Sequence, residues 1–180
     1  MKRTAKLVAY PLVAAIACHA SDVHATVPVD VEIAAKTGFA TNPTTTGPNP
    51  MGFGLGGRIG VSIAGLYAGA SAVYFFGGTA GTGMDSEQEN SVEYGGEIGY
   101  GVKISRFTIR GVLGIGNFQQ LGNGVATGGE NNLYVEPGVL AMCSFGAFFL
   151  GADVNAFFLP STPGNTNAAL TFHGQLGVSF

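Results

Sequence analysis

The sequence is short of charge, of tryptophan and of long apolar runs. Only 11% of its 180 residues are charged, against about 25% in an average soluble domain. It has no tryptophan and two cysteines, Cys18 and Cys143. After residue 25, no apolar run approaches the roughly 20 residues that a membrane-spanning helix needs. These absences argue against both an ordinary soluble surface and a helical membrane domain, and the 30 glycines further disfavour long helices.

The first 25 residues have the features of a secretory signal peptide. An apolar stretch over 7–18 is followed by small residues, and we predict cleavage after Ala25, with Cys18-His19-Ala20 as a second possible cleavage motif. The residues from Ala15 to Cys18 also resemble a lipobox, which would place a lipid on Cys18, although leucine is usual where Ala15 stands. Three basic residues precede the apolar stretch: Lys2, Arg3 and Lys6. We therefore predict a signal peptide over 1–25 and one domain over 26–180.

Removal of this leader leaves five basic and ten acidic residues, a net charge of −5. An acidic chain of this kind is a poor partner for nucleic acid, whose binding depends on neutralising phosphates. Only Cys143 remains in the mature chain, so an intramolecular disulfide and a cysteine-based metal site are excluded. Cys143 is expected to face lipid as a small apolar residue.

Apolar and polar residues alternate with a period of two over most of the mature chain, which predicts strands with two different faces. The last segment shows this best: apolar Leu170, Phe172, Leu176, Val178 and Phe180 alternate with Thr171, His173, Gln175 and Ser179. The same pattern predicts eight strands, over 29–39, 53–63, 66–76, 92–104, 107–116, 133–141, 148–158 and 168–180.

The connections between these strands alternate in length. Tight turns are expected at Ala64-Gly65, Ser105-Arg106 and Ser144-Phe145. Longer polar segments are expected over 41–51, 77–90, 119–130 and 160–167. This succession predicts an up-and-down meander with a short-turn end and a long-loop end, which is the arrangement of outer-membrane barrels.

Alternation alone does not say which face lies inside, because a soluble lipocalin-like barrel also has eight strands. In that alternative, the exterior would consist mainly of glycine, alanine and serine, with too little charge for solubility. With the apolar face in lipid, ten charged residues project into the lumen: Asp30, Glu32, Lys36, Arg58, Glu93, Glu97, Lys103, Arg110, Glu136 and Asp153. The other five charged residues of the mature chain fall in turns or loops: Asp85, Glu87, Glu89, Arg106 and Glu130.

With these features, the chain resembles the small outer-membrane barrels of the OmpA/OmpX type over essentially the whole mature sequence. The resemblance rests on the leader, the eight amphipathic strands, the alternating connections and the C-terminal Leu176-Gly177-Val178-Ser179-Phe180. It implies an all-β, eight-stranded antiparallel up-and-down transmembrane barrel in the cell outer membrane of a Gram-negative bacterium. Lipid and lipopolysaccharide would surround it, and the barrel-assembly machinery would recognise Leu176, Val178 and Phe180. Because tryptophan is lacking, the interfacial girdles would use other aromatic residues: Tyr94, Tyr100, Phe107, Phe148 and Phe158.

The lumen of an eight-stranded barrel is just wide enough to be filled by side chains, and buried charges need partners. We therefore predict a lumen charge network of the ten charged residues above with His173, either plugging the barrel or lining a narrow pore. Six acids face four bases, so two acids lack a basic partner. A two-residue turn at Ser144-Phe145 would place Glu136 directly opposite Asp153. Our hypothesis is that Arg110 or Arg58 bridges these two carboxylates.

Three motifs carry no specific chemistry in this context. The glycines from Gly54 to Gly60 resemble a nucleotide-binding loop, but no helix follows to hold phosphate. The acidic residues of 85–89 are expected to be solvated, because a dedicated calcium loop needs more convergent oxygens. His173 could belong to a lipid A deacylase-like site, but no serine or acid lies beside it in the sequence, and a hydrogen-bonded lumen histidine explains it better.

The sequence thus predicts a non-enzymatic barrel with no cofactor or metal, whose extracellular loops serve surface interaction or envelope integrity. The loop partner cannot be read from the sequence. The alternatives are a narrow pore for small solutes, a lipid A-modifying barrel enzyme and a soluble barrel.

Overall fold

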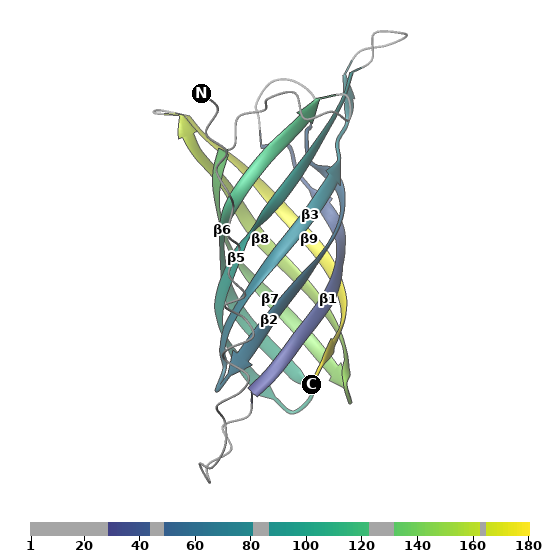
Figure 1. Cartoon of the computed structure of the whole chain (residues 1–180), viewed down its shortest axis with the longest axis vertical. Coiled ribbons are helices and arrows are strands. Elements are labelled where there is room, and N and C mark those ends of the chain that lie inside the picture. The colour runs from purple at the N-terminus through teal and green to yellow at the C-terminus, as the bar shows by residue number, and fades with distance from the viewer. Residues whose placement is uncertain (1–28, 44–48, 81–86, 123–131, 163–164) are drawn as a thin grey trace, which may run out of the picture.

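In the computed structural model, eight long antiparallel strands close into a single barrel (Figure 1). The structure describes residues 29–43, 49–80, 87–122, 132–162 and 165–180. The predicted signal peptide, with Ala25 and Cys18, lies outside these residues. The strands are β1 (Val29–Ala40), β2 (Gly52–Ile63), β3 (Leu66–Phe76), the short β4 (Thr79–Ala80), β5 (Glu87–Ile104), β6 (Phe107–Gly122), β7 (Asn132–Phe145), β8 (Phe148–Thr162) and β9 (Asn165–Ser179).

Each long strand pairs with the next long strand along the chain, and two further pairings close the sheet. β3 pairs with β5, while β4 only extends the loop end of β5, and β9 pairs with β1. Reciprocal backbone hydrogen bonds between Val31 and Phe180 complete the junction of β1 and β9. The prediction of an eight-stranded antiparallel up-and-down barrel is confirmed.

Within the described ranges, no helix is long and apolar enough to cross a membrane.

The tight turns lie at one end of the barrel, and two of the three occur where the sequence predicts them. Ala64-Gly65 and Ser105-Arg106 join their strands as expected. The third turn is Gly146-Ala147 rather than Ser144-Phe145, because Phe145 pairs with Phe148. Gly146 has a φ of +67°, a left-handed conformation that glycine adopts freely and that two-residue hairpins require at their first central position.

This turn changes the pairing of the two acidic residues on β7 and β8. Asp153 pairs with Leu140, and Glu136 lies between the pairs Val135–Phe158 and Gly138–Asn155. The prediction that Glu136 lies directly opposite Asp153 is therefore wrong. The error is four residues along the hairpin, which preserves the face of every side chain but moves the two carboxylates apart along the barrel axis.

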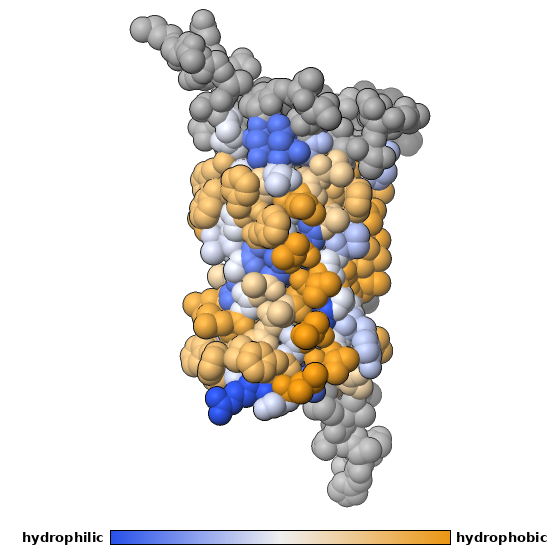
Figure 2. All heavy atoms as spheres, turned by 180° about the vertical axis from the view of Figure 1, so that it is seen from behind, coloured by the Kyte–Doolittle hydropathy of each residue, from blue (hydrophilic) through white to orange (hydrophobic). Residues whose placement is uncertain are grey.

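The exterior of the barrel is apolar, as the sequence predicts for a face in contact with hydrocarbon. Figure 2 shows apolar side chains over most of the wall between the two ends. Of the expected girdle residues, Tyr94, Tyr100, Phe107 and Phe148 are exposed, whereas Phe158 is half-buried. Cys143 is a free, half-buried thiol. Many aliphatic and aromatic side chains are exposed on the strands, including Ile33, Phe39, Leu55, Ile59, Ile98, Ile109, Leu133, Val139, Leu150, Val154, Leu170 and Phe172.

The interior contains apolar clusters as well as charge. The loop-end cluster fills the lumen near the long connections and consists of Ala40, Met51, Val73, Phe75, Phe118, Tyr134, Phe157, Leu159 and Ala169. The turn-end cluster consists of Ala34, Leu140, Met142 and Phe149. Met51 enters the loop-end cluster because the chain turns inward just before β2, where the Ser91 hydroxyl donates to the Pro50 carbonyl. Charged and polar side chains also project into the lumen.

Candidate functional site: the charged lumen

Eight of the ten charged residues predicted to face the lumen are buried, as is His173. They are Glu32, Lys36, Arg58, Glu93, Glu97, Arg110, Glu136 and Asp153. The other two lie at the turn end, where Asp30 is half-buried and Lys103 is exposed. The alternation of the strands explains this placement, because every second side chain of β1, β2 and β5 to β9 points into the barrel.

Glu32 is the centre of the group nearest the turn end. Arg110 binds its carboxylate through two nitrogens, with Nη1 at 2.9 Å from Oε2 and Nη2 at 2.6 Å from Oε1. Arg58 Nη2 donates to Oε2 at 2.7 Å, and the Ser62 hydroxyl donates to Oε1 at 2.8 Å. One carboxylate thus holds two guanidinium groups, and paired, charge-assisted hydrogen bonds of this kind are stronger than neutral ones.

Tyr67 organises the two arginines. The guanidinium carbon of Arg110 lies 4.3 Å from the centre of its ring, and that of Arg58 lies 5.0 Å from it. Stacking of a cation on an aromatic face adds attraction inside a desolvated lumen. The ring fits only because Gly60 has no side chain, since a Cβ there would lie 2.4 Å from the ring.

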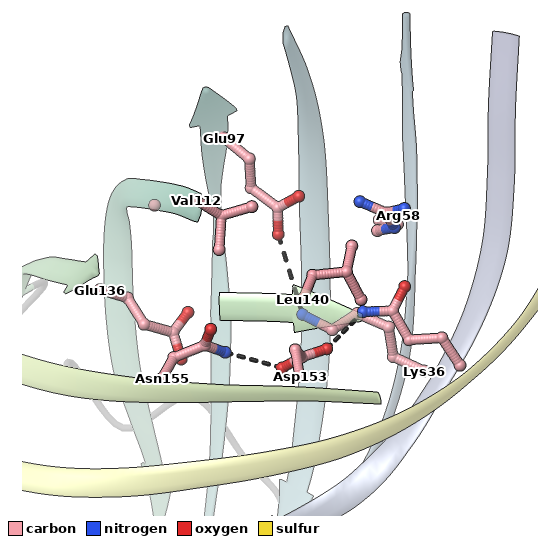
Figure 3. A pocket seen from close by; sticks show the side chains of 10 residues that line it. Lys36, Arg58, Glu97, Val112, Glu136, Leu140, Asp153 and Asn155 are labelled. Carbon is pink, nitrogen blue, oxygen red and sulfur yellow. Dashed lines mark hydrogen bonds and ion pairs between the residues drawn. The ribbon is translucent and has the colours of Figure 1, made fainter. Parts of the chain in front are cut away.

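A second group surrounds Asp153, which Figure 3 shows next to Asn155. His173 Nδ1 lies 2.8 Å from Asp153 Oδ1, and Asn155 donates to the same oxygen at 2.7 Å. Gln175 donates to the other oxygen, Oδ2. Four residues from β8 and β9 therefore form one hydrogen-bonded unit, which supports the pairing register of these two strands.

Lys36 lies between this unit and the remaining acids. Its Nζ is 3.8 Å from Glu97 Oε1, and Glu97 also accepts a hydrogen bond of 3.3 Å from the Tyr67 hydroxyl. Glu136 instead accepts from the Thr171 hydroxyl at 2.6 Å. In Figure 3, Lys36, Glu97, Glu136 and Asp153 converge on the same small space. The single lysine faces several carboxylates there.

The space at the centre of these side chains is small. It has a volume of about 10 Å³ and is lined by Lys36, Arg58, Glu97, Val112, Gly114, Glu136, Leu140, Asp153, Asn155 and Gln175. A cavity needs roughly 10–15 Å³ to hold one water molecule. The middle of the lumen is therefore filled by protein.

The bridging hypothesis is wrong. Arg110 and Arg58 both bind Glu32, whereas Glu136 and Asp153 take their hydrogen bonds from Thr171 and from the His173, Asn155 and Gln175 group. The reason is the register, because the two arginines reach the level of Glu32 near the turn end.

Glu93 is separate from both groups. It pairs in the sheet with Val73 and Phe118, two members of the loop-end cluster. Its side chain is 0% exposed, and neither carboxyl oxygen has a hydrogen-bond partner among the described residues. A buried polar group without a partner destabilises a protein by about 1–3 kcal/mol.

We predict that Glu93→Met stabilises the barrel by about 1–3 kcal/mol, because it replaces unpartnered oxygens with an apolar chain of similar length. The free energy of unfolding in urea measures this. Glu136→Met is the matched control and should be destabilising, because the Thr171 hydroxyl loses its acceptor. A loss of stability in Glu93→Met as large as that in Glu136→Met would show that the Glu93 carboxyl has a partner.

The proposed assembly signal lies at the end of β9. Leu176 and Phe180 are exposed on the outer face, and Val178 is half-buried and pairs with Ile33 and Phe148. Recognition of these three residues by the assembly machinery stays a prediction.

Sequence reasoning missed several residues that hold the charges in place. Tyr67, Ser62, Asn155, Thr171 and Gln175 all bind a lumen carboxylate. The alternation places all of them on the inward face. For example, Tyr67 lies between the outward Leu66 and Ala68. Their partners could not be predicted, because the contacts cross the barrel between distant strands.

The lumen holds no candidate metal cluster in the part of the chain that the structure describes. No three His, Cys, Asp or Glu side chains there are placed to hold a metal ion. His173 is 2% exposed and points into the lumen.

Comparison with known proteins relates this geometry to solved barrels. No protein-family model and no curated protein matches the sequence. Neisserial surface protein A (NspA) shares the fold with 13% identity and a TM-score of 0.58, over 84% of this chain and 97% of that chain. A major outer membrane protein from Thermus thermophilus has 12% identity and a TM-score of 0.54, over 84% of this chain and 99% of that chain.

Ail, the attachment invasion locus protein of Yersinia pestis, was solved in complex with the heparin analogue sucrose octasulfate. It has 12% identity and a TM-score of 0.50, over 84% of this chain and 97% of that chain. The fold and the apolar exterior agree with the outer-membrane location predicted from the sequence. The chain has the fold of the small eight-stranded barrels of the outer membrane.

Proposed function

We propose that this chain is a non-enzymatic, non-conducting outer-membrane barrel that serves surface interaction or envelope integrity through its long connections. The observation that carries the proposal is the filled lumen. Its central space measures about 10 Å³, with the loop-end cluster above it. A barrel filled in this way acts as a rigid frame, so recognition is left to its ends.

Planar bilayers test the sealed lumen. Protein purified from membranes should insert without discrete conductance steps, because the Glu32 and Asp153 groups and the loop-end cluster block the axis. The same preparation, checked by its shifted mobility on gels without boiling, serves as the folding control. Reproducible open states in a folded sample would overturn the proposal in favour of a narrow pore.

The long connections have an unusual charge. Together, the predicted ranges 41–51, 77–90, 119–130 and 160–167 contain four acidic residues and no Lys, Arg or His: Asp85, Glu87, Glu89 and Glu130. Recognition of a sulfated ligand, as seen in the Ail complex, depends on basic side chains. The composition therefore supports a neutral or cationic partner for this chain and argues against a sulfated glycan.

We predict that the folded protein is not retained on immobilised heparin at physiological salt, because its loop end repels sulfate groups. A variant carrying Asp85→Lys, Glu87→Lys and Glu89→Lys should be retained, since it differs only in the sign of three charges. Glu87 and Glu89, which the sequence places in a loop, lie at the start of β5. Retention of the unmodified protein at the same salt concentration would contradict the charge argument.

The buried His173 supports the non-enzymatic part of the proposal. Its imidazole is paired with Asp153 inside the barrel, away from the outward face of β9 that would contact membrane lipid. Lipid A incubated with the purified protein should remain unmodified. Modification that His173→Ala abolishes would overturn this conclusion.

A further inference from the structure

The turn end of the barrel contains a vestibule that the sealed lumen leaves open. This cavity has a volume of about 460 Å³, which is within the range of roughly 300–1,000 Å³ for small-molecule sites. Its floor is the Glu32 group, with Arg110 and Ser62, and its apolar wall includes Met142 and Phe149. Because short turns of outer-membrane barrels face the periplasm, the vestibule would open to that side.

Two opposite charges stand at the rim of this vestibule. Asp30 comes from β1 and Lys103 from β5, and these strands are separated around the wall by β2 and β3. Neither residue takes part in an ion pair within the described part of the chain. The charges on the floor, in contrast, are bound to each other. The rim therefore holds an acidic and a basic group on separate strands, and neither forms an ion pair with another described residue.

Hydroxyl groups also line the vestibule. Thr108, Ser144 and Ser179 all contribute to the wall, and a hydroxyl both donates and accepts hydrogen bonds. A simple anion would be attracted by Lys103 and repelled by Asp30. A simple cation would be attracted by Asp30 and repelled by Lys103. A ligand with an amino group at one end, a carboxylate at the other and amides between them matches the whole lining.

We propose that the vestibule binds short zwitterionic peptides, with the amino end toward Asp30 and the carboxylate toward Lys103. The amides of the peptide meet the wall hydroxyls, and Phe149 and Met142 provide the apolar contact. The site lies at the opposite end from the long connections, so it adds a second activity to the proposed function and does not depend on it.

Calorimetry with tri-alanine as the probe tests the proposal on protein purified from membranes in a non-ionic detergent. Tri-alanine should bind saturably, whereas N-acetyl-tri-alanine amide, which lacks both charges, should not. Asp30→Asn and Lys103→Gln should each weaken binding about tenfold, the equivalent of about 1.4 kcal/mol. Arg106→Gln is the matched control, because Arg106 is exposed in the adjacent turn and does not line the vestibule.

The charge-swapped variant Asp30→Lys with Lys103→Asp provides the sharpest test. It restores one acidic and one basic group at the rim, so it should bind tri-alanine more tightly than either single variant. Absence of saturable binding, equal binding of the uncharged probe, or a double variant weaker than both singles would overturn the proposal. The conductance of the same preparation reports separately on the sealed lumen.

Discussion

Glu32→Gln is expected to destabilise the barrel by about 3–5 kcal/mol, the cost of removing one partner from a buried charge group. The substitution changes charge with little change in volume. It leaves Arg58 and Arg110 buried on the same tyrosine ring with no carboxylate to bind. Two guanidinium groups without a shared anion repel each other, and both lose their charge-assisted hydrogen bonds.

Glu93→Gln is the matched control, because Glu93 is also a buried lumen glutamate but has no hydrogen-bond partner among the described residues. The same chemical change should therefore leave the free energy of unfolding nearly unaltered. Urea titration in lipid vesicles measures both variants, with the fraction folded read from gel mobility without boiling. The absence of tryptophan makes tyrosine fluorescence the optical probe.

A double-mutant cycle separates repulsion between the arginines from lost hydrogen bonding. Adding Arg110→Met to Glu32→Gln removes one of the two facing cations, so the double variant should be less destabilised than the sum of the single variants. Additive losses would show that the arginines do not interact through Glu32. An unaltered stability of Glu32→Gln would show that the Glu32 group is not a stabilising element.

The fold could be predicted because one physical rule governs every strand. Inward and outward side chains alternate, so once the apolar face is assigned to lipid, parity places Glu32, Arg58 and Asp153 in the lumen. A register error of two or four residues leaves each side chain on the same face of the sheet. This is why the incorrect turn at Ser144-Phe145 altered no assignment of faces.

The hydrogen-bond partners of the charged lumen residues could not be predicted, because they depend on how far along the barrel axis the strand register places each residue. The Gly146-Ala147 turn moves Asp153 opposite Leu140, and it leaves Glu136 with Thr171 instead of with an arginine. The contacts of Arg110 with Glu32 join β6 to β1, strands that share no edge. The glycine at position 146 was the available signal, because hairpin turns favour glycine at the first central position.

The second large effect is expected at Ile98, on the outer wall. Ile98 is 59% exposed and lies near the middle of the outward face of β5, between Tyr94 and Ile104. In hydrocarbon, Ile98→Arg should cost about 2–4 kcal/mol, the range for a basic side chain at the bilayer midplane. On a soluble barrel, the same change would place a charge in water at an exposed position and would alter stability by less than about 0.5 kcal/mol.

Ile104→Arg is the matched control because it makes the same change on the same strand next to the Ser105-Arg106 turn. Its side chain is 66% exposed, but it lies at the membrane edge, where an arginine costs about 0–1 kcal/mol. Urea unfolding in vesicles should therefore give a much lower free energy of unfolding for Ile98→Arg than for Ile104→Arg. Equal stabilities would contradict the assignment of the apolar face to lipid. Because the sealed lumen and the turn-end vestibule are both defined relative to that face, this comparison tests the premise on which the other predictions rest.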